Sequence, residues 1–211
     1  MKKSLLIVFL VLLIDQILKV WVKTHMYLGE EFSVLGNWFI IHFTENPGMA
    51  FGMEFGGGYG KLFLSVFRIF AVLGIAWYLH KLIKEKAPNL VIVSLSLILA
   101  GAIGNIIDSV FYGVLFSDSL NQLASFMPQE GGYTSLLHGR VVDMLYFPLI
   151  EGHFPSWSPI WANEQFMFFR PVFNIADTAI SFGVGILLVF QRSFFSNEKE
   201  LSDENSQTLK E

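Results

Sequence analysis

Residues 90–112 read LVIVSLSLILAGAIGNIIDSVFY and are apolar almost throughout. A helix needs about 20 such residues to cross about 30 Å of hydrocarbon, so this stretch predicts a transmembrane helix. Residues 4–22, 62–79 and 172–195 have the same character. The sequence therefore predicts a membrane protein of the all-α class with four transmembrane helices.

The composition agrees with this class. Of the 211 residues, 53% are hydrophobic and 15% are charged, and the mean hydropathy is +0.53. The first apolar stretch follows Lys2 and Lys3, a pattern that also begins cleaved signal peptides. However, that stretch is longer than a signal-peptide core, lacks a small-x-small cleavage site after it and contains Asp15 and Lys19. We therefore expect it to remain as a helix.

The distribution of basic residues predicts the orientation. Lysines precede the first predicted helix and fill the short link between the second and the third. Because basic residues favour the cytoplasmic side, both termini are expected there. The long connections at 24–61 and 113–171 then lie outside. We expect one membrane domain at 1–195 and a polar cytoplasmic tail at 196–211.

The first outer connection contains signals for a small β-rich element. Residues 32–43 are rich in aromatic and β-branched side chains and are interrupted by Gly36 and Asn37, a pattern that predicts a hairpin. Pro47 and Gly48 follow as a turn dipeptide.

The second outer connection is long for a segment without structure of its own. It contains Phe154, Trp157, Trp161 and the aromatic residues at 166–169. Such side chains favour the headgroup level of a membrane, which indicates an interfacial anchor. Lining of a substrate groove is the alternative.

Two carboxylates lie in apolar surroundings, Asp143 and Asp177. An ionisable group within a membrane segment costs roughly 2.5 to 3.5 kcal/mol on insertion scales, so a partner or a function is expected. A salt bridge to Arg140 is the ordinary explanation for Asp143, and a helix N-terminal cap is the ordinary explanation for Asp177. Alternatively, the two acids lie together, and repulsion leaves one protonated as an acid and the other ionised as a base.

Further polar residues share helix faces with these acids. Gly101, Asn105 and Asp108 are spaced i, i+4, i+7 in the third predicted helix, and Asn174 precedes Asp177 by three residues. Lipid cannot satisfy an amide or a carboxylate, so both faces should turn toward other helices. Either close helix packing or a site explains them.

Two basic residues within the predicted helices need anionic partners or water. Lys19 follows Asp15 by four residues, which places both on one face as an expected ion pair. Arg68 lies in the second turn of the second helix. We expect it to extend to the membrane surface or to meet a buried acid.

Several chemistries lack their residues in this sequence. There is no Cys, so a thiol nucleophile is excluded. The His spacing fits no metal motif, and phosphate loops and basic tracts for nucleic acid are absent. We therefore expect no metal, no cofactor and no nucleic-acid partner.

Five motifs occur in order: Asp15-Gln-x-x-Lys19, Asn46-Pro-Gly-Met-Ala-Phe51, Gly101-Ala-Ile-Gly-Asn105-Ile-Ile-Asp108, Val141-Val-Asp143 and Phe173-Asn174-x-Ala-Asp177. Together they closely resemble the lipoprotein signal peptidase (signal peptidase II) family, from about residue 15 to about residue 181. The resemblance implies an aspartyl endopeptidase of the bacterial inner membrane. Such an enzyme cuts prolipoproteins before a diacylglyceryl-modified Cys, so its partners are these substrates and membrane lipid.

The resemblance also implies roles for individual residues. The catalytic pair of the family falls on Asp143 and Asp177. Polar residues that support the pair or hold substrate fall on five further positions: Asp15, Asn46, Asn105, Asp108 and Asn174.

The chain departs from the family pattern in two places. Ser109 follows Asp108, where the family commonly has Arg, so a cationic contact is missing. Arg140 is expected to support the dyad or the substrate instead, from another direction. The segment at 113–137 makes the connection to Asp143 longer than the family pattern, which indicates an added outer element.

Two rival functions use the same acids. A transporter or proton-relay protein also carries buried acids, but along a path through the membrane. An assembly partner without activity would use them as structural pairs. Clustering of the acids toward one membrane face favours the peptidase over the relay.

Overall fold

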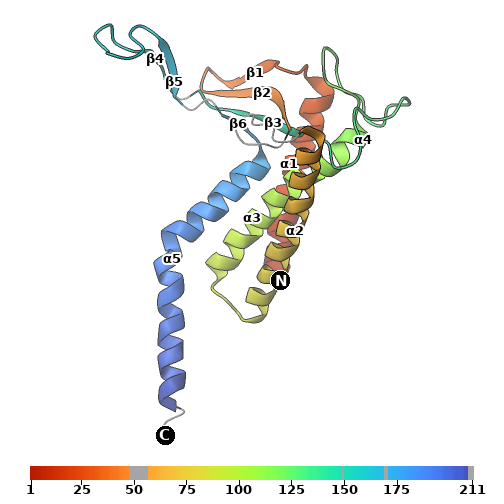
Figure 1. Ribbon diagram of the computed structural model, residues 1–211. Helices are drawn as coiled ribbons and strands as arrows, with labels where there is room; N and C mark the ends of the chain where they lie inside the picture. Colours follow the sequence, from red (N-terminus) through yellow and green to blue (C-terminus); the bar gives the residue numbers. More distant parts are fainter. Residues whose placement is uncertain (48–56, 149, 169–170, 209–211) are drawn as a thin grey trace.

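The computed structural model describes residues 1–47, 57–148, 150–168 and 171–208 (Figure 1). Within these residues, three helices are long and apolar enough to cross a membrane. They are α1 (Lys2–His25), α2 (Gly57–Lys84) and α3 (Asn89–Ile107) with its continuation. A fourth helix, α5 (Ile175–Thr208), has a shorter apolar part at Ile175–Gln191. The chain thus has three to four apolar helices.

The predicted fourth helix at 172–195 is wrong at both ends. Val172 and Phe173 form a strand, and α5 begins at Ile175 and runs to Thr208. The helix starts late because the Asn174 side chain accepts the N–H of Asp177 at 2.8 Å, the bond of an N-terminal cap. It continues into the predicted polar tail because Glu, Lys and Leu there are good helix formers.

The third predicted helix changes type near its outer end. After Ile107 the chain forms a π-helical turn, η2 (Asp108–Tyr112), followed by one short turn, α4 (Gly113–Leu115). A π-helical turn often accompanies a functional site. Here it lies in the segment that contributes the fully buried carboxylate of Asp108.

A small antiparallel sheet covers one end of the helices (Figure 1). Its strand order is β1-β2-β3-β6, namely β1 (Glu31–Leu35), β2 (Phe39–Asn46), β3 (Val141–Tyr146) and β6 (Val172–Phe173). The hairpin predicted at 32–43 is present, with Gly36 at a φ of +54° in its turn. Asp143 lies on β3 opposite Thr44 of β2, so one candidate acid belongs to the sheet and not to a helix.

The aromatic part of the second connection forms a separate hairpin. It consists of β4 (Ile150–His153) and β5 (Gln165–Phe168), and it projects away from the helices (Figure 1). Its loop exposes 80% of Trp157 and 59% of Trp161, while Phe154 contacts Trp161 at a ring distance of 5.6 Å. Both the anchor and the groove interpretations of these aromatics stay predictions.

The largest cluster of buried apolar side chains lies where the sheet meets the helices. It includes Val22 of α1, Phe43 of β2, Tyr112 of η2 and Val142 of β3. The N-terminus lies at the opposite end of the helices (Figure 1). The sheet is therefore fixed on the ends of α1 and α3 by apolar packing.

Two glycines allow the helices below the sheet to approach closely. A Cβ on Gly101 would lie 2.1 Å from the carbonyl oxygen of Ala176, and one on Gly104 would lie 2.8 Å from a carboxylate oxygen of Asp15. Any larger residue would push α1 or α5 away from α3. The prediction that this face of α3 turns toward other helices is confirmed.

Candidate active site

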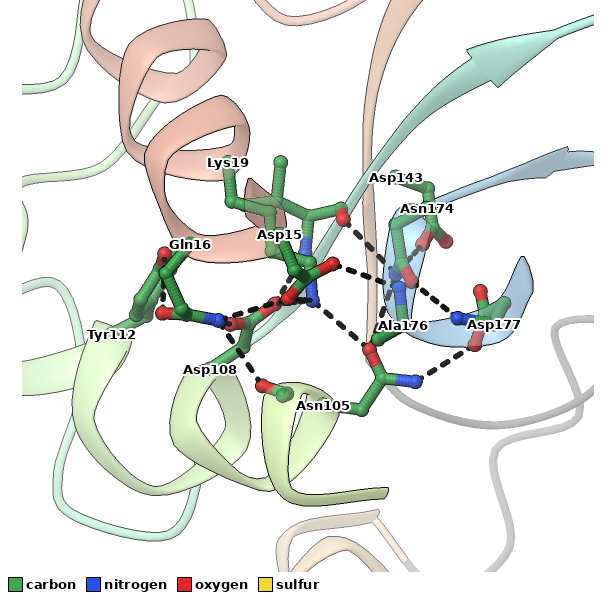
Figure 2. A network of polar contacts seen from close by, with 12 residues as sticks. Asp15, Gln16, Lys19, Asn105, Asp108, Tyr112, Asp143, Asn174, Ala176 and Asp177 are labelled. Carbon is green, nitrogen blue, oxygen red and sulfur yellow. Dashed lines mark hydrogen bonds and ion pairs between the residues drawn. The ribbon is translucent and has the colours of Figure 1, made fainter. Parts of the chain in front are cut away.

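Polar side chains from α1, α3, β3 and α5 meet beneath the sheet (Figure 2). Asp15, Lys19, Asp108 and Asn174 are completely buried, and Asp143 is 5% exposed. Buried polar groups of this kind need hydrogen-bond partners, and the network supplies them. The structure thus gathers residues that are far apart in the sequence.

Asn174 links the two candidate acids. Its Nδ2 donates to Oδ1 of Asp143 at 2.7 Å, and its Oδ1 accepts the N–H of Asp177 at 2.8 Å. Asn105 Nδ2 donates to Oδ1 of Asp177 at 2.7 Å. Asn174 Nδ2 also lies 3.2 Å from Oδ1 of Asn105 (Figure 2). The two amides therefore join both carboxyl groups in one hydrogen-bonded network.

Asp143 is in surroundings that favour its protonated form. Burial, and then the nearby charge of Asp177, raise the pKa of Asp143 from 3.8 to about 7, against smaller opposing contributions. Hydrogen bonds from Asn174 and Asn46 and the charge of Lys19 are the groups that oppose the rise. A proton on Asp143 near neutral pH beside a second carboxyl group provides an acid and a base in one place.

Lys19, Asp15 and Asp108 form a buried trio of charged groups next to the two candidate acids. Lys19 Nζ lies 2.9 Å from Oδ2 of Asp15 and 2.9 Å from Oδ2 of Asp108. The predicted pairing of Lys19 with Asp15 is confirmed. Asp15 Oδ1 also accepts the N–H of Ala176 at 2.9 Å, and Asp108 Oδ2 accepts the N–H of Val142 at 3.2 Å. The trio thus ties α1 and η2 to the elements that carry the two candidate acids.

Two members of the network were missed in the sequence. Gln16 Nε2 donates to Oδ1 of Asp108 at 3.0 Å, and the hydroxyl of Tyr112 donates to Oε1 of Gln16 at 3.2 Å. The position of Gln16 beside Asp15 was a signal for it. Tyr112 gave none, because its inward position depends on the π-helical turn.

Arg140 belongs to a second polar cluster. Its Nη1 lies 2.8 Å from Oε2 of Glu45, its Nη2 lies 3.5 Å from Oδ2 of Asp118, and its guanidinium stacks on Tyr133. Lys23 also pairs with Glu45. Since the contacts described for Arg140 lead to these residues, the predicted salt bridge with Asp143 is replaced by Glu45. Support of the dyad by Arg140 stays a prediction.

This second cluster joins the segment at 113–137 to the sheet. Ser119 Oγ donates to Oε1 of Glu45 at 2.9 Å, and the hydroxyl of Tyr133 accepts the N–H of Arg140 at 2.7 Å. The side chain of Glu45 is only 2% exposed. Lys23, Glu45 and this segment were not recognised as a unit from the sequence, because their pairing depends on the fold.

The position of Ser109 is closed to solvent. The residue is 1% exposed, and among the described residues its Oγ has no hydrogen-bond partner. A charge from a further element acts on one of the candidate acids, because Arg68 on α2 interacts electrostatically with Asp177. This interaction agrees with the expectation that Arg68 meets an acid, although Asp177 is half-buried, and extension of Arg68 to the membrane surface stays a prediction.

Part of the second motif lies outside the described residues. Asn46 and Pro47 are described, and Pro47 accepts a hydrogen bond from Lys61 Nζ through its carbonyl oxygen. Residues 48–51 of the motif, with the predicted turn at Gly48, are not among the described residues.

Comparison with known proteins agrees with the motifs. The sequence model of the family described as signal peptidase (SPase) II matches residues 7–193. The lipoprotein signal peptidase of Porphyromonas gingivalis (strain ATCC 33277) is 56% identical over 184 residues, which are 87% of this chain and 80% of that protein. The lipoprotein signal peptidase of Amoebophilus asiaticus (strain 5a2) is 40% identical over 190 residues, or 89% of this chain and 76% of that protein.

A solved structure has the same fold. It is described as a bacterial membrane enzyme determined by the in meso method at 2.3 Å resolution. The TM-score is 0.60 at 23% identity, with 95% of this chain and 93% of the other covered. At that identity the likeness speaks for the fold. The family model and the two relatives identify the family as well as the fold. They show that the chain belongs to the signal peptidase II family.

Proposed function

We propose that this membrane protein is an aspartic endopeptidase that removes the signal peptides of prolipoproteins. The substrate class follows from the family and from the lipoprotein signal peptidase of P. gingivalis, 56% identical over most of the chain. The aspartic mechanism rests on one observation above all. Asn174 is hydrogen-bonded to Asp143 through its amide nitrogen and to the backbone of Asp177 through its oxygen.

The reaction needs one proton shared by the two carboxyl groups. The ionised carboxylate takes a proton from a water molecule, and the water oxygen attacks the scissile carbonyl carbon. The protonated carboxyl group then gives its proton to the leaving amide nitrogen as the C–N bond breaks. The rise in the pKa of Asp143 to about 7 keeps a proton available at neutral pH. No covalent enzyme intermediate is required.

The other predicted residues hold this pair in place. Asn105 and Asn174 orient the carboxyl groups, and a buried amide that lost these partners would be destabilised by about 1 to 3 kcal/mol. Asn46 hydrogen-bonds to Asp143 from β2. Asp15 and Asp108, bridged by Lys19, fix the backbone of α5 and of β3.

We place the protein in the bacterial inner membrane with the sheet on the extracytoplasmic side. The sheet, which carries Asp143 on β3, lies at one end of the helices, and the N-terminus lies at the other (Figure 1). The diacylglyceryl chains of the substrate cysteine would remain in the lipid. The peptide would reach the site from the membrane side.

The decisive assay compares two synthetic prolipoprotein peptides, one with a diacylglyceryl-modified Cys and one without the lipid. Purified wild-type protein should cut only the lipidated peptide, before the modified Cys. Asp143→Asn and Asp177→Asn should each reduce cleavage by about 10³-fold or more, since a dyad fails when either member is lost. Asp118→Asn, at a half-exposed acid of the second cluster, is the matched control and should leave cleavage nearly unchanged.

Substantial cleavage by either Asp143→Asn or Asp177→Asn would refute the dyad. Equal cleavage of both peptides would refute selection for the lipidated Cys. The rival transporter would instead move solute or charge across vesicles without cutting either peptide. Its case is weakened because Asp143 lies in the sheet, Asp108 lies just after α3 and Asp177 lies in the first turn of α5, so these acids do not follow a path along the helices.

A further inference from the structure

The polar network of Figure 2, in which Asp177 is half-buried, contains more carboxyl groups than cations. Asp15, Asp108, Asp143 and Asp177 contribute four carboxyl groups, and Lys19 contributes one ammonium. Lys19 is already bonded to Asp15 and Asp108, each at 2.9 Å. The charge of Lys19 is therefore largely compensated by Asp15 and Asp108. If Asp143 and Asp177 share one proton, a negative charge still remains on these two carboxyl groups. Such charge in a poorly solvated place needs a further cation.

Helix α2 carries two cations that interact with acids of this network. Lys61, Ser65 and Arg68 are spaced i, i+4, i+7 and so share one face of this helix. Lys61 is 8% exposed and Ser65 is 3% exposed, and Ser65 Oγ donates to the carbonyl oxygen of Leu137 at 2.8 Å. This face of α2 is therefore turned inward, toward the segment that leads into β3. The helix also packs along α3, which carries Asn105.

Arg68 is the last of these three residues along α2. Its side chain is half-buried, and its charge interacts with that of Asp177. Lys61, about one turn before Ser65 on the same face, interacts instead with Asp108. The two cations on this face of α2 thus interact with different acids. Lys61 interacts with Asp108, and Arg68 interacts with Asp177 of the dyad. In a medium of low dielectric constant, an interaction between charges stays strong over several ångströms.

We propose that Arg68 is a positioning residue of the dyad, which favours the negative charge on Asp177 and so leaves the shared proton on Asp143. The proposal rests on the function proposed above and assigns the two roles within it. Asp177 is then the base that takes the proton of water, and Asp143 is the acid that protonates the leaving nitrogen. The guanidinium acts through Asp177 and need not touch the substrate.

The expected signature is in the pH dependence of cleavage. Loss of the positive charge makes the dyad take up its second proton at higher pH, so the acidic limb of kcat should move upward. We expect a move of about one pH unit for Arg68→Gln, which is about a tenfold loss of kcat on the acidic limb. The KM for the lipidated peptide should change less than about twofold, since the residue does not bind substrate. Charged groups facing the dyad, and so able to influence this limb, are Asp15, Lys19, Arg68 and Asp108.

The test measures kcat and KM from pH 4.5 to 8.5 for wild type, Arg68→Gln, Arg68→Met and Arg68→Lys. Arg68→Lys keeps the charge and should keep the wild-type acidic limb, whereas both neutral variants should shift it. The methionine variant has an apolar side chain suited to a membrane helix, so one neutral variant remains if the glutamine does not fold. Lys81→Gln is the matched control, because this exposed cation lies at the other end of the same helix and pairs with Glu85.

Three outcomes would overturn the proposal. They are an unchanged acidic limb in a folded neutral variant, a shift in Arg68→Lys as large as in Arg68→Gln, or a large rise of KM at constant kcat. The last would make Arg68 a substrate-binding residue. Failure of the proposed function gives a different result from failure of the Arg68 proposal. In that case the wild type would not cut the lipidated peptide, or Asp143→Asn and Asp177→Asn would still cut it.

Discussion

Replacement of Asp143 by Asn should stabilise the protein at neutral and alkaline pH while it abolishes activity. In the folded chain the carboxyl group has a pKa of about 7, against 3.8 as its ordinary value. Between these pH values the folded state therefore holds a proton that the unfolded state has already lost. Stability of the wild type must fall as pH rises through this window, because the unfolded state binds fewer protons.

The size of the effect follows from the difference between the two pKa values. A difference of about three pH units, at about 1.4 kcal/mol per unit, gives about 4 kcal/mol at pH 8. The amide of Asn has nearly the same shape as the carboxyl group and carries no charge. Its oxygen can still accept the hydrogen bond that Asn174 donates to the carboxyl group. Asp143→Asn should therefore match the wild type near pH 4 and exceed it progressively up to pH 8.

The measurement is denaturant unfolding in detergent micelles at pH 4, 6 and 8, for wild type and Asp143→Asn. Asp118→Asn is a control of opposite sign. Although burial acts to raise it, the backbone N–H of Leu120 and the charge of Arg140 hold the pKa of Asp118 below its usual value. That acid stabilises the fold at neutral pH. An Asp143→Asn advantage that is independent of pH would refute a carboxyl group protonated by its surroundings.

Three further changes test the support of the site. Gly101→Ala places a Cβ 2.1 Å from a backbone oxygen of α5, so it should reduce kcat at least tenfold. Gly185→Ala is the control, because its added Cβ meets no atom within 4 Å among the described residues, and it should leave kcat unchanged. Steady-state kinetics compare the two variants. Asn174→Ala should lower the free energy of unfolding by about 3 kcal/mol, from a lost helix cap and an unpaired carboxyl group, and denaturant unfolding at pH 6 measures it. Glu45→Gln leaves the buried cation of Lys23 without its acid and removes one acid of Arg140, so it should also lower the free energy of unfolding by about 3 kcal/mol, a loss that Glu31→Gln at an exposed acid should not reproduce.

The elements that depend on local pattern could be predicted from the sequence. Apolar length located α1, α2 and α3, and alternating β-branched and aromatic residues around Gly36 located the β1–β2 hairpin. Helix spacing correctly turned Asn105 and Asp108 toward other helices. The pairing of Asp15 with Lys19 followed from their separation of four residues.

What depends on contacts between distant residues could not be predicted. The strand that carries Asp143 was not recognised, because its run of apolar residues does not alternate and strands buried on both sides resemble membrane segments. The partner of Arg140 lies 95 residues away at Glu45. The start of α5 was placed three residues early, because the apolar run does not reveal that Val172 and Phe173 pair with β3.

The two acids of the proposed dyad come from different parts of the molecule, one from strand β3 and one from helix α5. During biosynthesis Asp177 is among the last residues of the domain to leave the ribosome. A partly made chain therefore has a complete sheet sequence but no second carboxyl group. On the proposed mechanism, cleavage would require the packing of α5 against α3. A chain that lacks α5 would then be unable to cleave neighbouring membrane proteins.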